Sequence, residues 1–208
     1  MIKIKNRFFF ILAFSMGLVV ALSNYLVQFP ITYMSLEEIF TYGAFSYPVA
    51  FLITDLANRR YGKEIARKIV YIGFVLGLFL TLYFSTDFSN LISKRIAIGS
   101  GIAFLTAQLL DVQVFDKLRA KAWFVAPFIS SLIGSVTDTF LFFSIAFYGT
   151  GINWITLSFG DLFVKIFVAI IMLIPFRFLL STVKEIDEVE KINVYFYEFS
   201  LKKVWLVD

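Results

Sequence analysis

Five ionisable side chains lie inside long apolar stretches of the sequence. They are Asp55, Asp111, Asp138, Asp161 and Lys165. A charged group at the centre of a bilayer costs about 2.5 to 3.5 kcal/mol on insertion scales, so such residues need a partner or a function. Carboxylates accept hydrogen bonds and an ammonium group donates them, so these residues could bind a polar solute.

The sequence has few residues that could support metal binding, nucleophilic catalysis or ATP hydrolysis. The sequence contains no histidine and no cysteine, which removes the imidazole and thiolate groups that most metal sites and nucleophilic enzymes use. A phosphate-binding G-x-x-x-x-G-K-[ST] loop is also absent, so ATP hydrolysis is not expected. We therefore expect no enzymatic activity, no metal and no cofactor. The enzymatic alternative, a membrane-embedded enzyme acting on lipid or prenyl substrates, would also lack a D-x-x-D metal pair.

The composition is that of an integral membrane protein. Of the 208 residues, 60% are hydrophobic, 19% are aromatic and only 16% are charged. Six stretches are about long enough to cross a hydrocarbon core as helices, at residues 8–29, 39–57, 66–86, 95–116, 122–147 and 160–180. We predict an all-α bundle of six transmembrane helices that forms one transporter domain over 1–180, followed by a cytoplasmic C-terminal tail over 181–208.

The distribution of lysine and arginine predicts the topology. If the N-terminus is cytoplasmic, the inside connections carry basic clusters such as 59–68 and 117–121, whereas the outside connections carry only Lys94 and Arg95. This bias places both termini in the cytoplasm. The first stretch resembles a signal peptide, but it continues to full membrane length, so we interpret it as an uncleaved helix.

This topology places the ionisable residues at two depths. Asp55 and Asp111 lie toward the cytoplasmic ends of their helices, whereas Asn24, Asp138 and Lys165 lie in the outer half. Asp138 and Lys165 could neutralise each other across the fifth and sixth helices, and they could also contact a solute.

Asp55 and Asp111 could have a structural role, as partners in ion pairs, instead of binding a solute. Asp55 is four residues before Arg59, a spacing that favours an ion pair on a helix. Asp55 and Arg59 would then be structural or gating residues, with Asp55 a possible ligand contact on the exit side. Asp111 could pair with Lys117 or with the basic loop in the same way, but Gln108 lies one turn before it on the same face, which favours a shared polar surface.

Two further patterns bear on pockets and partners. Gly43 and Pro48 in "GAFSYP" predict a broken or kinked second helix, which could form a pocket wall or could be a simple proline kink. Ala13, Gly17 and Ala21 form a stripe of small residues that lets another helix approach closely. The stripe could pack within the bundle, or it could receive a partner subunit or a second copy of the chain.

The longest motifs resemble those of a known family. They are "SNYLVQFP", "GAFSYPVAFLITDLANRRYG", "LLDVQVFDKLR" and "WFVAPFISSLIGSVTDTFLFFSIAF". Over about residues 23–175 they resemble the queuosine precursor transporter family. The resemblance implies a multi-pass importer in the inner membrane of a bacterium. Its substrates would be 7-cyano-7-deazaguanine and 7-aminomethyl-7-deazaguanine, which are salvaged into tRNA queuosine.

The implied substrate suggests which side chains would bind it. A guanine-like edge offers adjacent N–H donors to a carboxylate and a carbonyl to an amide or ammonium group. Flat rings beside these groups could stack on the base. We therefore predict a substrate site that comprises Asn24, Phe45, Tyr47, Gln108, Asp111, Asp138 and Lys165.

The mode of energy supply is left open by the sequence. A carrier could use a gradient, or could act passively while downstream enzymes trap the base. The family is also similar in architecture to the substrate-binding subunits of energy-coupling-factor vitamin transporters. In that alternative the chain would bind a vitamin or other small heterocycle, and the small-residue stripe of the first helix would contact the energy-coupling partner.

Overall fold

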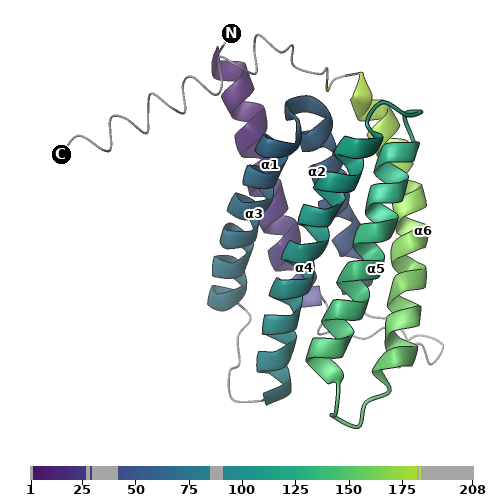
Figure 1. Cartoon of the computed structure of the whole chain (residues 1–208). Coiled ribbons are helices and arrows are strands. Elements are labelled where there is room, and N and C mark those ends of the chain that lie inside the picture. The colour runs from purple at the N-terminus through teal and green to yellow at the C-terminus, as the bar shows by residue number, and fades with distance from the viewer. Residues whose placement is uncertain (1, 27–28, 30–41, 85–90, 182, 184–208) are drawn as a thin grey trace.

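The computed structural model describes residues 2–26, 29, 42–84, 91–181 and 183 (Figure 1). The described residues form an all-helical bundle, which confirms the predicted fold class at that level. The helices are α1 (Ile2–Leu26), α2 (Gly43–Tyr61), α3 (Lys63–Phe84), α4 (Leu91–Leu118), α5 (Val125–Phe147) and α6 (Trp154–Leu180). The predicted tail over 181–208 lies outside the described residues, apart from Ser181 and Val183.

Several helices extend beyond the apolar stretches that predicted them. α1 begins at Ile2 rather than at residue 8, and α2 ends at Tyr61 rather than at residue 57. Hydropathy detects only the part of a helix that suits a hydrocarbon core, whereas the hydrogen-bonded backbone continues into the charged ends.

Four of the described helices are long and apolar enough to cross a membrane. They are α1, α4, α5 and α6. α2 and α3 carry charged residues at their adjoining ends, with Arg59 and Arg60 in the last turn of α2 and Glu64 in the first turn of α3. The tight connection between them uses Gly62, whose φ of 83° is a left-handed conformation that glycine adopts readily. The Gly62 N–H donates to the carbonyl of Asn58 over 2.9 Å.

α2 is the central helix of the bundle. It packs against each of the other five helices, which is why most of its side chains are buried. The helix is continuous through Pro48, so it is not broken there, and the alternative of a proline kink stays a prediction. Pro48 lies in the second turn, where its ring leaves only the carbonyl of Ala44 without a helical partner.

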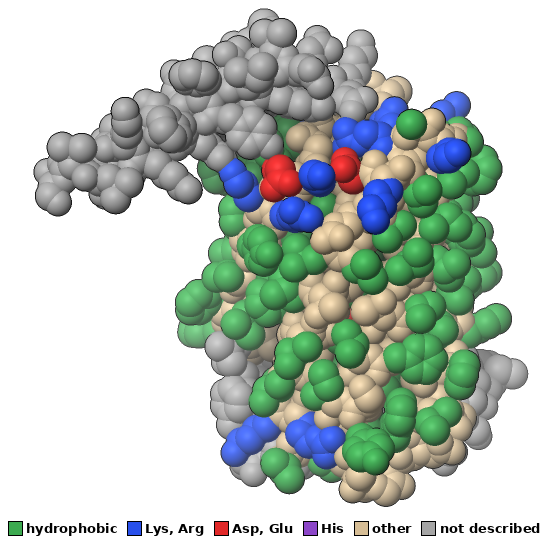
Figure 2. All heavy atoms as spheres, viewed as in Figure 1, with side chains coloured by type: hydrophobic (Ala, Val, Ile, Leu, Met, Phe, Trp, Pro, Cys, Tyr) green, Lys and Arg blue, Asp and Glu red, His purple; other side chains and the backbone are tan. Residues whose placement is uncertain are grey.

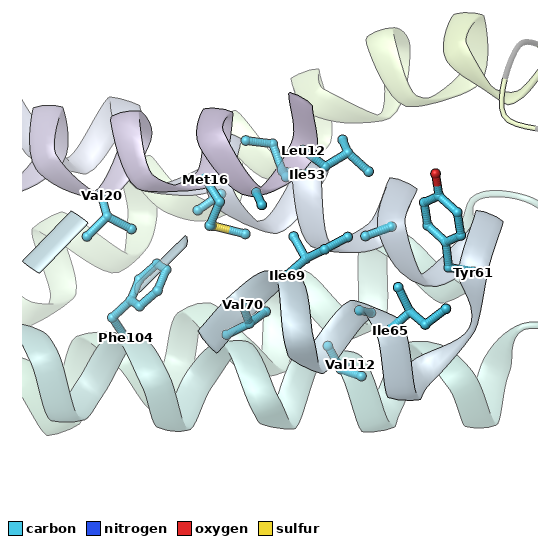
Figure 3. Close-up of a cluster of buried hydrophobic side chains, with 14 of the residues drawn as sticks. Leu12, Met16, Val20, Ile53, Tyr61, Ile65, Ile69, Val70, Phe104 and Val112 are labelled. Atoms are coloured by element: carbon cyan, nitrogen blue, oxygen red, sulfur yellow. The ribbon is translucent and has the colours of Figure 1, made fainter. Parts of the chain in front are cut away.

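One apolar core joins α1, α2, α3 and α4. Figure 3 shows Met16 of α1 and Ile69 of α3 at its middle, with Ile53 of α2 and Phe104 of α4 around them. α1 and α3 approach closely because Gly17 faces Gly73 and Gly77. The small-residue stripe therefore packs within the bundle, where Ala13 and Gly17 are buried and Ala21 remains partly exposed. The alternative use of the stripe by a partner stays a prediction.

The surface has an apolar middle and basic ends. Apolar side chains cover the face seen in Figure 2 between two zones of lysine and arginine. The upper zone in this view lies where α2 and α4 end and α3 and α5 begin (Figure 1). The lower zone lies at the opposite end, where Lys94 and Arg95 begin α4. This pattern suits a bundle whose middle contacts lipid.

Candidate functional site

Buried polar side chains, together with the partly exposed Asn24, form two clusters inside the bundle. The Lys165 cluster consists of Asn24, Tyr47, Ser100, Asp138, Thr139, Asp161 and Lys165. The Asp55 cluster consists of Thr54, Asp55, Gln108, Asp111, Ser130, Ser131 and Ser135. The prediction from the sequence places Asn24, Asp138 and Lys165 in the outer half of the membrane. It places Asp55 and Asp111 near the cytoplasmic side. The structure separates the same two sets into different clusters.

The Lys165 ammonium group bridges two carboxylates. Its Nζ lies 2.8 Å from Asp138 Oδ2 and 2.5 Å from Asp161 Oδ2. The predicted neutralisation of Asp138 by Lys165 is therefore confirmed. Thr139 completes the arrangement, because its hydroxyl donates to Asp161 over 2.8 Å and accepts from Lys165 over 3.1 Å. Both carboxylates thus share one cation.

Tyr47 connects this ion cluster to a network on α1 and α4. Its hydroxyl donates to Asn24 Oδ1 over 2.8 Å and lies 2.8 Å from the Ser100 hydroxyl. Ser100 donates to the same Asn24 oxygen over 2.7 Å. The Tyr47 ring lies 5.2 Å from Lys165 Nζ, within the range of a cation–π contact. Asn24, Tyr47, Asp138 and Lys165 are therefore brought together, as predicted.

Asp55 does not pair with Arg59, so the predicted ion pair is wrong. The carboxylate accepts hydrogen bonds from two hydroxyl groups of α5, Ser130 at 3.2 Å and Ser131 at 3.4 Å. Arg59 donates instead to the carbonyl of Arg119 over 3.3 Å. The reason is that Asp55 points into the interface with α5, whereas Arg59 reaches the end of α4.

Gln108 and Asp111 share a face of α4, and both have polar atoms without a partner. The Gln108 side-chain oxygen accepts from Thr54, but its Nε2 has no hydrogen-bond partner among the described residues. Neither carboxylate oxygen of Asp111 has one in the same part of the chain, although the side chain is 0% exposed. The predicted pairing of Asp111 with Lys117 is therefore wrong.

α5 carries a polar stripe that extends from one cluster to the other. Its buried face includes Ser131, Ser135, Asp138 and Thr139, and the Ser135 hydroxyl lacks a hydrogen-bond partner in the described residues. Ser131 and Asp138 are separated by about 10 Å along the helix axis, at 1.5 Å per residue. The stripe therefore provides a continuous line of polar groups through the bundle.

Two small pockets share Phe176 in their lining, and the first of them lies beside the Asp55 cluster. The first is lined by Asp55 and Ser131 together with Pro48 and Phe176, so Pro48 does form part of a pocket wall. It has room for about one water molecule, far less than a purine-sized base needs. The second pocket is also lined by Phe176 and extends between Arg59 and Arg119 at the basic end. Neither of these two pockets is therefore large enough for such a base.

Phe45 lies apart from both clusters. Its side chain is 45% exposed, in the first turn of α2. Its predicted contact with substrate stays a prediction.

Several polar residues of the site were not predicted from the sequence. The prediction from the sequence pairs Lys165 with Asp138 alone, although Asp161 precedes Lys165 by the four residues that suit a helical ion pair. Serines are common in membrane helices, so Ser100, Ser130 and Ser131 carried no comparable signal. Within the described residues there is also no group of three metal-binding side chains that could hold an ion.

Comparison with known proteins shows to which family the chain belongs. A family model described as "Putative vitamin uptake transporter" matches residues 41–180, about two thirds of the chain. The chain belongs to this family. The part matched by the vitamin uptake transporter family includes α2 to α6 and every residue of both polar clusters except Asn24.

Curated relatives carry more specific names than the family model does. The chain is 38% identical over 200 residues to the "Probable queuosine precursor transporter" of Haemophilus influenzae, covering 82% of this chain and 85% of that protein. It is 35% identical over 177 residues to the "Queuosine precursor transporter" of Escherichia coli, covering 76% and 79%. These relatives confirm the family resemblance found in the sequence motifs. No solved structure matches the chain significantly.

Proposed function

We propose that this member of the vitamin uptake transporter family imports queuosine precursors into a bacterial cell. The names of the Haemophilus influenzae and Escherichia coli relatives support this substrate class. The transported molecules are the deazaguanine bases 7-cyano-7-deazaguanine and 7-aminomethyl-7-deazaguanine, and they enter tRNA queuosine after import.

One observation carries the choice of substrate site. Gln108 presents an unpartnered donor and Asp111 two unpartnered acceptors on one buried face of α4. The Watson–Crick edge of a deazaguanine has the complementary order, with two adjacent N–H donors beside a carbonyl. The Asp111 carboxylate would accept from the two donors, and Gln108 Nε2 would donate to the carbonyl. Leaving these groups unpaired is costly, so a base that pairs them binds at an advantage.

The Lys165 cluster would contribute in a different way. Lys165, Asp138 and Asn24 already bond within the protein, so a base must exchange partners with them. Tyr47 would supply a flat ring beside the Lys165 ammonium group. Phe45 would contact a base only while the base enters from the surface of the protein. Asp55 lines the first pocket and Arg59 lines the second pocket at the basic end, which suits gating of the exit.

The proposed membrane arrangement follows from the charges. All six helices cross the inner membrane, and the basic end that contains Arg59 and Arg119 faces the cytoplasm, so both termini are cytoplasmic. Residues 1–180 form the transporter domain in this arrangement, and 181–208 form a cytoplasmic tail.

The second candidate function is a substrate-binding subunit of an energy-coupling-factor transporter. The family description, which refers to vitamin uptake, favours this alternative. A partner or a second copy would have to use the face of α1 near Ala21, because Ala13 and Gly17 are covered by α3. Uptake by liposomes that contain only this chain would exclude a requirement for such a partner.

Complementation tests the proposed function directly. Cells that cannot make or import the precursors would be given the full chain and fed each base separately, and queuosine in their tRNA would be measured. We expect queuosine to return with at least one of the two bases. If neither base restores it while the protein is present in the membrane, the proposal is wrong.

A further inference from the structure

The Lys165 ammonium group has already used all of its hydrogen-bond donors. An ammonium group carries three N–H donors. Lys165 Nζ lies 2.8 Å from Asp138 Oδ2 and 2.5 Å from Asp161 Oδ2. It also donates to the Thr139 hydroxyl over 3.1 Å. These three acceptors match the three donors, so Lys165 has none left for another atom of the cluster.

One oxygen of each carboxylate is left over. Every hydrogen bond and ion pair that the described residues make with Asp138 and Asp161 uses Oδ2, including the bond that the Thr139 hydroxyl donates to Asp161. The two Oδ1 atoms therefore accept no hydrogen bond within the described part of the chain. Leaving a carboxylate oxygen unpaired in a protein interior is costly, so these atoms favour a donor from a ligand.

Ser135 supplies a third acceptor of the same kind. Its side chain is 0% exposed, and its hydroxyl has no hydrogen-bond partner among the described residues. Ser135 precedes Asp138 by three residues and Thr139 by four, so it lies one turn away on the same buried face of α5. The Ser135 oxygen and the two Oδ1 atoms equal in number the three N–H donors of a second ammonium group.

The charges of the Lys165 cluster are also unequal. Two carboxylates share one ammonium group. The side chains that α1, α2 and α4 add to the cluster, Asn24, Tyr47 and Ser100, carry no charge. With both aspartates ionised, one negative charge is in excess. A buried charge without a counter-charge is destabilising, so the cluster suits a ligand with one positive charge better than a neutral ligand.

Asp161 is the most accessible charged residue of the cluster. Its side chain is 11% exposed, compared with 6% for Asp138 and 3% for Lys165. Loss of the Asp161 carboxylate would leave the 2.8 Å pair of Lys165 and Asp138 in place. Asp161 is therefore the position at which the excess charge can be removed with the least effect on packing.

We propose that the Lys165 cluster binds the protonated amine of 7-aminomethyl-7-deazaguanine, so that the protein prefers this base to 7-cyano-7-deazaguanine. A primary aliphatic amine is protonated at neutral pH, as the lysine side chain is, whereas a nitrile is uncharged. The ammonium group of the base donates to the two free Oδ1 atoms and neutralises the cluster without displacing Lys165. The inference rests on the proposed function, because it concerns the choice between the two bases.

Equilibrium binding to the purified full-length protein tests this preference. The Kd would be measured for the aminomethyl base, for the cyano base, and for 7-hydroxymethyl-7-deazaguanine, a neutral analogue of nearly the same size as the aminomethyl base. A hydrogen-bonded charge contributes about tenfold to a hundredfold in affinity, so the aminomethyl base should bind more tightly than the hydroxymethyl base by about that factor.

Substitution of Asp161 separates recognition of the amine from a structural effect. Asp161→Asn removes the excess charge, so the aminomethyl base should lose its advantage while the Kd of the hydroxymethyl base changes little. Asp161→Glu keeps the charge and should keep a preference for the amine. Asp116→Asn is the matched control, because Asp116 is a partly exposed aspartate paired with Lys63 and Arg119, and it should keep the wild-type ratio of Kd values.

The ratio of Kd values for the aminomethyl and hydroxymethyl bases can be measured on the wild-type protein even if a variant does not fold. Equal affinity of the wild-type chain for these two bases would overturn the amine site, and it is the result expected if a bound proton neutralises the cluster. An unchanged preference in a folded Asp161→Asn variant would overturn the site as well. Binding of none of the three bases would instead contradict the proposed function.

Discussion

Tyr47 and Lys165 place an aromatic ring and an ammonium group 5.2 Å apart at the centre of the bundle. Tyr47 comes from α2 and Lys165 from α6, so this contact joins the ion cluster of α5 and α6 to the network that holds Asn24 and Ser100. A flat heterocycle that entered here would find a ring to stack on and a cation to contact, while the unpartnered groups of Gln108 and Asp111 lie in the neighbouring cluster.

Lys165→Met should destabilise the protein strongly. The change leaves Asp138 and Asp161 buried without their shared cation, which typically costs about 3 to 5 kcal/mol. The midpoint of thermal unfolding in detergent would measure the loss. Lys94→Met is the control, since Lys94 is an exposed lysine of α4 and should change the midpoint little. Adding Asp138→Asn to Lys165→Met should recover part of the loss, and strictly additive effects would contradict the ion pair.

Asp111→Asn should separate stability from transport. The carboxylate has no hydrogen-bond partner in the described residues, so its replacement should leave the unfolding midpoint unchanged or higher. Binding of a deazaguanine should weaken by about tenfold to a hundredfold, because a hydrogen bond to a charged group contributes about 1.5 to 3 kcal/mol. Equilibrium binding of labelled base to the purified protein measures this, with Asp116→Asn as control. Unchanged binding would remove Asp111 from the substrate site.

Tyr47→Leu and Phe45→Leu should differ in their effect on uptake. Tyr47 is buried beside Lys165, and loss of its ring should raise the KM by about tenfold, as expected for one aromatic contact. Phe45 is exposed, so its replacement should change the KM by less than about twofold. Initial rates of precursor uptake in cells, normalised to the amount of inserted protein, give both values. Equal effects of the two changes would contradict this distinction.

The sequence predicted the Asp138–Lys165 pair because few ionisable residues occupy the apolar stretches, and opposite charges there must find each other. The same reasoning failed for Asp55. Local spacing favoured Arg59, but the actual partners, Ser130 and Ser131, lie 75 and 76 residues further along the chain. A contact that depends on how α2 and α5 pack leaves no trace in the spacing of either helix.

The sequence predicts where the helices lie better than it predicts how they pack against one another. The apolar stretches located all six helices of the described residues, because a long hydrophobic run has few other uses. The central place of α2 was not foreseen, although its polar residues have a physical meaning in retrospect. A helix that packs against five others can bury Thr54, Asp55 and Asn58 among polar partners, whereas a helix facing lipid could not.

The close contact between α1 and α3 gives a prediction about packing alone. A Cβ added at Gly77 would lie 2.6 Å from Val20 Cβ and 3.2 Å from the Gly17 carbonyl oxygen, whereas one added at Gly101 would come no closer than 3.6 Å to the Phe74 ring. Gly77→Ala should therefore force the helices apart and destabilise the protein by about 1 to 3 kcal/mol.

Gly101→Ala is the matched control and should be neutral or stabilising by up to about 1 kcal/mol, because alanine favours a helix more than glycine does. The unfolding midpoints of the two variants in the same detergent make the comparison. If Gly77→Ala were as stable as Gly101→Ala, α1 and α3 could not be packed as closely as the contact between Gly17 and Gly77 requires.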